Sequence, residues 1–208
     1  MKIAHQDQSE ILKFLQLLKD HLVSQNNSFD TTVLDISVGS TPTMFSHQKM
    51  DIPNKLDLHP GNYVFFDRQQ LYSKACEDED SIAGFVLARV IAQYKDAARN
   101  AIMVNAGATA LTKEVAPQGD VCSVYGIPDL ECYRMSQETT MIRLKDGGDT
   151  MFPFEAFPLG TVLLLIPNHS CLAAACFDVY HVVDDEDIGE DSEVVDTWEP
   201  VKGWKLSC

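Results

Sequence analysis

Residues 160–171 read GTVLLLIPNHSC, a short apolar run that ends abruptly in polar residues. The length of the run suits one β-strand, because a membrane-spanning helix needs about 20 apolar residues. Pro167 and Asn168 end the run, so His169 and Cys171 are predicted to lie on a turn at the tip of a strand. Since residues two apart in extended chain point to the same side, we expect the imidazole and the thiol to share a side.

Similar short runs surround this stretch at residues 85–94, 101–104 and 179–183. Turn residues such as the Pro-Gln-Gly sequence at 117–119 separate them. Several short strands joined by glycine- and proline-containing turns are typical of a small antiparallel β domain or barrel. The change to this pattern predicts a domain boundary near residues 73–83.

The first part of the chain has a different pattern. Apolar positions between Ser9 and Val23 follow a helical stripe, with Ser9 as the expected N-cap. Two runs, Thr32–Gly39 and Asn62–Phe66, are predicted strands. A helix, a strand, a Gly-Ser-Thr loop and a second strand indicate an α/β unit. A parallel barrel needs roughly 200 residues or more, so this segment is predicted to be the end of one.

The composition bounds the class of protein. The chain has 208 residues, 45% hydrophobic and 23% charged, which is typical of a folded protein. A net charge of −15 argues against nucleic acid or an anionic membrane as partner, because both bind basic surfaces. The six cysteines form no CxxC pair, and the polar AHQDQSE after Lys2 does not suit a secretory signal. We therefore expect a cytoplasmic protein with free thiols.

His169 and Cys171 are the first candidates for chemistry. An imidazole and a thiolate suit zinc, which favours nitrogen and sulfur ligands. Two protein ligands would leave positions open for water or substrate, as a catalytic metal requires. A histidine close to a cysteine is more often a packing or surface pair, so the spacing alone leaves both interpretations open.

Two loops that follow the predicted strands are candidates for binding phosphate. They are Gly39–Thr43 (GSTPT) and Pro60–Tyr63 (PGNY). Backbone amides and hydroxyls of such loops bind phosphate at the rim of a barrel, although polar turns have the same composition. His59 could orient the second loop. The other histidines are predicted to be surface residues (His5, His21 and His47) or structural (His181).

Five motifs, in order along the chain, resemble those of eukaryotic-type D-serine dehydratases and the related D-threonine aldolases. They are DISVGSTPT (35–43), LHPGNYVFFDRQQ (58–70), VNAGATALTKE (104–114), GTVLLLIPNHSCLAAACFDVYHVV (160–183) and VVDTWEPVKGW (194–204). The resemblance implies an alanine-racemase-like (β/α)8 barrel that binds pyridoxal phosphate, followed by an antiparallel β domain that carries a metal. Residues 1–75 would then hold the last barrel strands, and residues 76–208 the β domain.

The same resemblance implies the site residues. His169 and Cys171 match the zinc ligands of the family, and Asp in place of Cys171 is typical of the aldolases. The residues that match the phosphate-binding positions are Thr41, Gly61 and Asn62, with Ser40 and Tyr63 as neighbours. The cofactor-binding lysine of the family lies near the start of the barrel, in a region absent from this chain, so no catalytic residue is assigned.

The implied reaction is the zinc-assisted β-elimination of D-serine to pyruvate and ammonia. Two alternatives are a D-threonine aldolase reaction and a truncated, non-catalytic homologue that binds a full-length partner. The resemblance also implies that the full-length protein pairs as a homodimer. The sequence departs from the family pattern at Thr139, where relatives have histidine, and at Asn105, where many have aspartate. The acidic stretch at 184–193 resembles an insertion into a hairpin loop.

Overall fold

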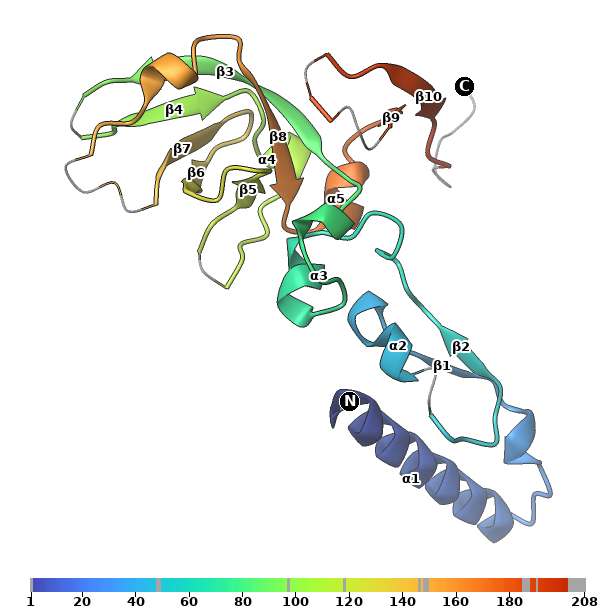
Figure 1. The fold of residues 1–208 in the computed structure, drawn as a ribbon. Coiled ribbons are helices and arrows are strands. Elements are labelled where there is room, and N and C mark those ends of the chain that lie inside the picture. The colour runs from blue at the N-terminus through green and yellow to red at the C-terminus, as the bar shows by residue number, and fades with distance from the viewer. Residues whose placement is uncertain are drawn as a thin grey trace.

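The computed structural model describes residues 2–201 apart from 48–49, 97, 118, 146, 148–149, 185–187 and 190. Its largest element is one six-stranded sheet (Figure 1). The strands are β3 (Val86–Tyr94), β4 (Ala101–Val104), β5 (Cys122–Val124), β6 (Leu130–Met135), β7 (Thr140–Leu144) and β8 (Val162–Pro167). They lie in the order β5-β8-β3-β4-β7-β6, and every neighbouring pair runs antiparallel.

The sheet curls until its two edge strands approach each other. Val121, next to β5, donates its backbone N–H to the carbonyl of Cys132 in β6 at 3.2 Å. Strand β3 pairs with β8 through its first half and with β4 through its second, with a register shift between Val90 and Ala92. A bulge of this kind bends a strand and increases its twist, which helps a sheet to close. The predicted antiparallel, barrel-like β domain is therefore confirmed.

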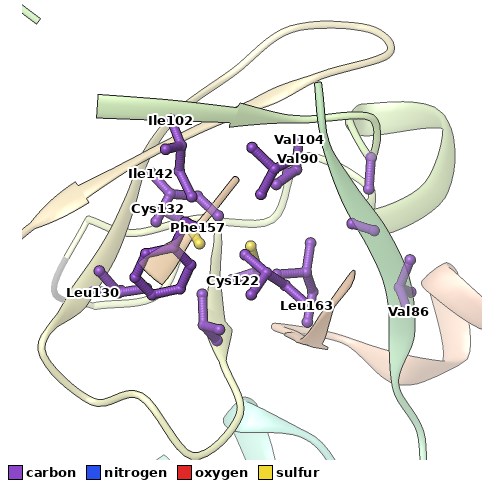
Figure 2. Close-up of a cluster of buried hydrophobic side chains, with 14 of the residues drawn as sticks. Val86, Val90, Ile102, Val104, Cys122, Leu130, Cys132, Ile142, Phe157 and Leu163 are labelled. Carbon is purple, nitrogen blue, oxygen red and sulfur yellow. The ribbon is translucent and has the colours of Figure 1, made fainter. Parts of the chain in front are cut away.

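Alternation along β3 shows how the sequence builds this domain. Val86, Ala88 and Val90 are buried, whereas Leu87 and Ile91 point outward. The inward side chains of all six strands meet in one core (Figure 2). Three phenylalanines from the segment before β8, at positions 152, 154 and 157, pack into the same core and against one another.

Shorter elements surround the barrel. The helices are α3 (Arg68–Ser73), α4 (Ala108–Leu111) and α5 (Ser170–Ala174), and the 3-10 turns are η3 (Glu79–Ser81) and η4 (Phe154–Ala156). Strands β9 (Tyr180–Val183) and β10 (Val194–Trp198) form a separate antiparallel hairpin. The predicted acidic insertion lies between these two strands, and residues 185–187 and 190 of it fall outside the described residues.

The N-terminal part contains a long helix beside a small parallel sheet (Figure 1). Its elements are α1 (Lys2–Ser24), η1 (Thr31–Val33), β1 (Ile36–Val38), η2 (Thr41–Thr43), α2 (Met44–His47) and β2 (Leu56–Leu58). The parallel pairing of β1 with β2 confirms the predicted α/β pattern. Among the described residues, no helix combines the length and the apolar character needed to cross a membrane.

Three local predictions are wrong in this part. Residues 62–66 form a turn, since Phe66 has a φ of 52° and donates its N–H to the carbonyl of Asn62, and the strand lies earlier at Leu56–Leu58. Ser9 lies inside α1 and does not cap it. His47 is only 1% exposed, because its ring packs beside Gly39 and Nε2 bonds the Asp7 carboxylate at 2.8 Å.

Candidate functional site

The tip of β8 is held by a buried asparagine. Asn168 directly follows Pro167, the last residue of the strand, and its side chain accepts a hydrogen bond from Arg68 Nη1 at 2.8 Å. Its amide nitrogen donates to the carbonyls of Glu114 (2.7 Å) and Asp120 (3.1 Å). Arg68 also pairs with the Asp120 carboxylate at 2.7 Å. These bonds fix the point at which the chain leaves the sheet, and they therefore fix the position of His169.

His169 and Cys171 lie where β8 gives way to α5. His169 is extended, with φ −137° and ψ 100°, and it is the N-cap residue of the helix. Cys171 lies in the first helical turn, and both residues are half-buried. Both residues therefore lie at the tip of the strand, as predicted, but the argument from extended chain does not hold for Cys171, because α5 starts at Ser170 and the alternation of a strand ends there.

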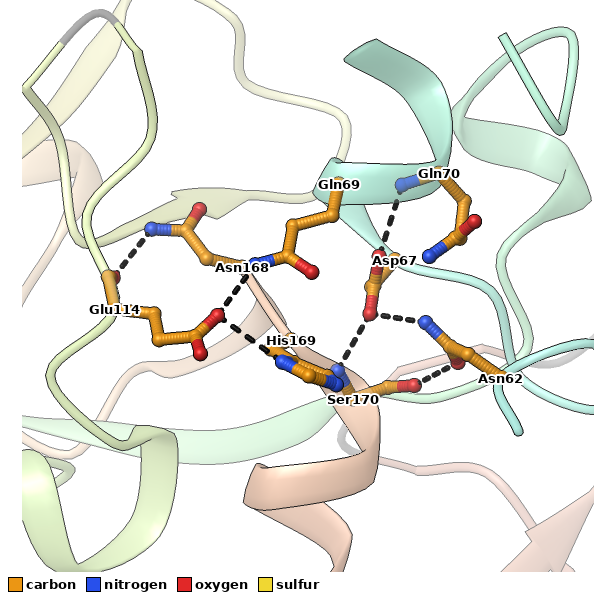
Figure 3. A network of polar contacts seen from close by, with 8 residues as sticks. All are labelled: Asn62, Asp67, Gln69, Gln70, Glu114, Asn168, His169 and Ser170. Carbon is orange, nitrogen blue, oxygen red and sulfur yellow. Dashed lines mark hydrogen bonds and ion pairs between the residues drawn. The ribbon is translucent and has the colours of Figure 1, made fainter. Parts of the chain in front are cut away.

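Asp67 joins this helix start to the N-terminal part of the chain (Figure 3). Its side chain is fully buried and accepts a hydrogen bond from the backbone N–H of Ser170 at 2.7 Å. It also accepts from the backbone of Gln70 at 3.0 Å, as the N-cap of α3, and from the side chain of Asn62. One carboxylate thus caps two helices, because it accepts hydrogen bonds from backbone amides that have no partner within either helix.

The two predicted phosphate loops meet at the same place. The backbone N–H of Asn62 donates to the Thr41 hydroxyl at 2.8 Å, and the Asn62 side chain accepts from the hydroxyl of Ser170. A Cβ added to Gly61 would lie 3.8 Å from the sulfur of Cys171. The structure therefore brings Thr41, Gly61 and Asn62 together with the His169–Cys171 turn, although the two sets come from opposite ends of the chain.

The five predicted phosphate residues do not all present free groups. The Thr41 hydroxyl and the Asn62 side chain are buried and bonded within the protein, so they shape the loops. Ser40, Gly61 and Tyr63 are exposed. His59 bonds Ser37 on the neighbouring strand, which fits its predicted role in holding the second loop.

The donors at the strand tip suit zinc chemically. His169 Nδ1 lies 3.1 Å from Glu114 Oε2, which leaves Nε2 to face a ligand. Burial, together with the charge of Asp67, raises the pKa of the Cys171 thiol, so metal binding must displace its proton. Within the described part of the chain, no group of three or more histidine, cysteine or carboxylate side chains is gathered for a metal. A metal here would take two protein ligands and others from elsewhere.

The two departures from the family pattern have structural roles. Asn105 Oδ1 accepts a hydrogen bond from the backbone N–H of Arg89 at 2.6 Å, beside the bulge of β3. Thr139 closes the turn between β6 and β7, where its hydroxyl lies 2.7 Å from that of Ser136. That turn accepts hydrogen bonds from the start of α4.

Sequence reasoning missed four residues that build the site: Arg68, Asp67, Glu114 and Asn168. Signals for two of them were available. Asp67 precedes a short polar helix as an N-cap would, and Glu114 ends one of the quoted motifs. Their partners lie as far as 103 positions away along the chain, so the pairing itself carries no local signal.

With this geometry in place, the β domain is found to be similar to a known family. Residues 83–183 match a family whose description reads "Putative serine dehydratase domain". The resemblance drawn from the five motifs is thereby confirmed.

Relatives extend the match beyond the domain. The chain is 35% identical to D-serine dehydratase of Schizosaccharomyces pombe over 185 residues, which cover 82% of this chain and 41% of the relative. The chain thus spans less than half the length of that relative. An "ala racemase-like protein" from Idiomarina loihiensis has a similar structure, with a TM-score of 0.67, 28% identity, and coverage of 91% of this chain and 48% of that one.

Solved structures of D-threo-3-hydroxyaspartate dehydratase from Delftia are also similar. A mutant with alanine in place of a cysteine, described as metal-free, matches with a TM-score of 0.68 and 27% identity over 89% of this chain and 48% of that one. A second mutant of that protein replaces the histidine two positions before the same cysteine. The spacing of those two residues equals that of His169 and Cys171 here.

Proposed function

We propose that this chain forms the metal-binding part of a D-serine dehydratase-like lyase, which uses pyridoxal phosphate and zinc to convert D-serine to pyruvate and ammonia. The observation that carries the proposal is the junction of the His169–Cys171 turn with the loops of Thr41 and Asn62. The names of the similar dehydratases support the reaction class.

Zinc is held by His169 through Nε2 and by Cys171 through its sulfur. The half-buried position of both residues supports this assignment, as does the Glu114 carboxylate behind the histidine ring. The similar Delftia dehydratase also supports the assignment, since its variant with alanine in place of a cysteine is described as metal-free. Gly61 leaves space beside the sulfur that a larger side chain would fill.

The phosphate of the cofactor is held by the loops that contain Thr41, Gly61 and Asn62. The hydrogen bond between Thr41 and Asn62 joins the two loops. Ser40 and Tyr63 lie exposed beside these residues. Gly39 has a φ of 88°, and a Cβ there would lie 2.7 Å from His47 Nδ1, so the first loop needs glycine at this position. The joined loops and the glycine at position 39 support the assignment of an anion to this surface.

These residues bind and orient the reacting groups. When bound, pyridoxal phosphate acidifies the α-hydrogen of an amino acid, and zinc acts as a Lewis acid on its β-hydroxyl. The residues of this chain would hold both groups at the junction of the two loops with the His169–Cys171 turn. Asp67 keeps the start of α5 fixed to the phosphate loops while this happens.

The domain assignment follows from the same proposal. Residues 1–75 form the C-terminal part of an alanine-racemase-like (β/α)8 barrel, which β1, β2 and α1 support by their parallel α/β arrangement. Residues 76–208 form the metal-carrying β domain. In a protein that contains both parts, we expect a homodimer that acts on a small D-amino acid.

Metal analysis of the purified chain tests the zinc site directly. We expect the chain to bind one zinc ion and the His169→Ala variant to lose it. His181→Ala is the matched control, because His181 is an exposed histidine on β9. Equal zinc content in the wild type and in His169→Ala would remove the assignment.

The reaction is tested with a hybrid protein, in which this chain replaces the matching region of the Schizosaccharomyces pombe dehydratase. With pyridoxal phosphate and zinc, we expect the hybrid to release pyruvate from D-serine, and His169→Ala to reduce the release to background. Glycine and acetaldehyde from D-threonine would instead favour the aldolase alternative. Pyruvate release that does not depend on His169 would contradict the proposed mechanism.

A further inference from the structure

The carboxylate of Glu114 lies behind the ring of His169, the proposed metal ligand. Its Oε2 atom lies 3.1 Å from His169 Nδ1 and also accepts a hydrogen bond from the side-chain amide of Gln69 (Figure 3). The main-chain carbonyl of Glu114 is bonded to the buried Asn168 at 2.7 Å. Glu114 is therefore fixed at both ends, through its backbone and through its side chain.

We propose that Glu114 is the positioning residue of the metal site, which holds His169 in the tautomer that carries its proton on Nδ1 and leaves Nε2 unprotonated. The inference rests on the proposed role of His169 as a metal ligand. In this role Glu114 is not itself a ligand and acts through the histidine, which it contacts directly.

The chemistry of the three groups determines the direction of each bond. An ionised carboxylate only accepts hydrogen bonds, so the ring nitrogen that faces it must carry a proton. The Gln69 amide donates to the same oxygen, which prevents that oxygen from turning toward another donor. A neutral imidazole with its proton on Nδ1 has its lone pair on Nε2, the form that binds a metal ion.

The surroundings of His169 and Glu114 help the carboxylate to hold the imidazole ring. The side chains of His169 and Glu114 are 28% and 35% exposed, so water only partly competes for the bond. Three separate segments meet here, because Gln69 comes from α3, Glu114 follows α4 and His169 follows β8. The backbone after His169 cannot shift freely, since the N–H of Ser170 is bonded to the buried Asp67. A ring bonded to Glu114 on a backbone fixed by Asp67 loses little orientational freedom when a metal binds.

The size of the effect follows from partners of this kind in other metal sites. Removing a carboxylate that orients a ligating histidine usually weakens metal affinity by about 10- to 100-fold. We therefore expect Glu114→Gln to raise the zinc dissociation constant at least about tenfold. Gln69→Ala should change the constant in the same direction but less, because it removes only the support of the carboxylate.

Nitrogen NMR of the metal-free chain tests the tautomer without any zinc. With ¹⁵N-labelled histidine, the wild type should show His169 protonated at Nδ1, and Glu114→Gln should show a mixture of the two neutral tautomers. A carboxylate with a merely structural role would leave the tautomer unchanged. A wild-type histidine protonated at Nε2 would overturn the inference.

Zinc titrations of the same proteins complete the experiment. Glu131→Gln is the matched control, since it removes one negative charge from another glutamate, whose ion-pair partner is Arg143 and not His169. Circular dichroism confirms that each variant is folded. If the wild type binds zinc through His169 but Glu114→Gln binds it equally well, this inference fails alone. If the wild type binds no zinc, the proposed metal site fails with it.

Discussion

The β domain and the N-terminal α/β part differ in how they are stabilised. The six strands of the β domain enclose a continuous core that includes Ile102, Ile142 and Leu165, all of them fully buried. Among the described residues before Cys76, Leu15 is the only hydrophobic side chain that is buried. Exposed apolar side chains on α1 instead include Phe14 and Leu17.

The contrast shows where the rigidity of the site comes from. His169 and Cys171 follow a central strand of the β domain, whereas the phosphate loops extend from a two-stranded sheet of three-residue strands. A two-stranded sheet is only marginally stable by itself. The metal half of the junction is therefore held by a core, and the phosphate half is held mainly by its bonds to the β domain.

Truncation of one core side chain in each part should give the largest difference. Ile142→Ala should lower the unfolding free energy of the β domain by about 4 kcal/mol, because it opens a cavity among fully buried neighbours. Leu15→Ala should leave that value unchanged within about 0.5 kcal/mol, since α1 lies outside this core. Urea titration followed by hydrogen exchange of the β4 and β7 amides measures both. A loss of similar size in the two variants would show that the parts unfold as one unit.

Asp67→Ala should have a smaller effect that is confined to the junction. The change removes three accepted hydrogen bonds from a fully buried carboxylate, which we expect to cost about 3 kcal/mol. Faster hydrogen exchange at Ser170, Gln70 and Asn62, with little change at β4, would support this expectation. Asp35→Ala is the control, because Asp35 is an exposed carboxylate in the same part of the chain. Uniform destabilisation of the barrel would show that the junction is part of the core.

The sequence was most informative where one face of a strand is buried. The short apolar runs at 85–94 and 160–166 predicted β3 and β8 to within a few residues, because strands that build a core carry many apolar side chains. The strand predicted at 62–66 failed because its aromatic residues do not cover a sheet. Asn62 there bonds across the junction to Ser170, and Phe66 takes a positive φ.

The candidate site was predictable only in part for a similar reason. His169 and Cys171 stand close together in the sequence and carry recognisable chemistry. The groups that hold them do not, since Asp67 and Glu114 reach them across 103 and 55 positions of chain. A single carboxylate in a polar stretch has many possible partners, and only the closing of the barrel selects one.

The smallest predicted effect is a pH dependence that belongs to the β domain alone. A hydrogen bond with Cys132 and complete burial raise the pKa of the Cys122 thiol well above 9.0, its ordinary value. The unfolded chain therefore loses this proton first as pH rises above 9, so stability is full below that pH and falls above it by about 1.4 kcal/mol per pH unit. Cys122→Ala removes this contribution, and its urea midpoints should fall less steeply between pH 8.5 and 10.5 than those of the wild type. Parallel pH profiles of the wild type and Cys122→Ala would mean that Cys122 ionises as readily in the folded barrel as in the unfolded chain. Water would then reach the place where β5 and β6 approach each other.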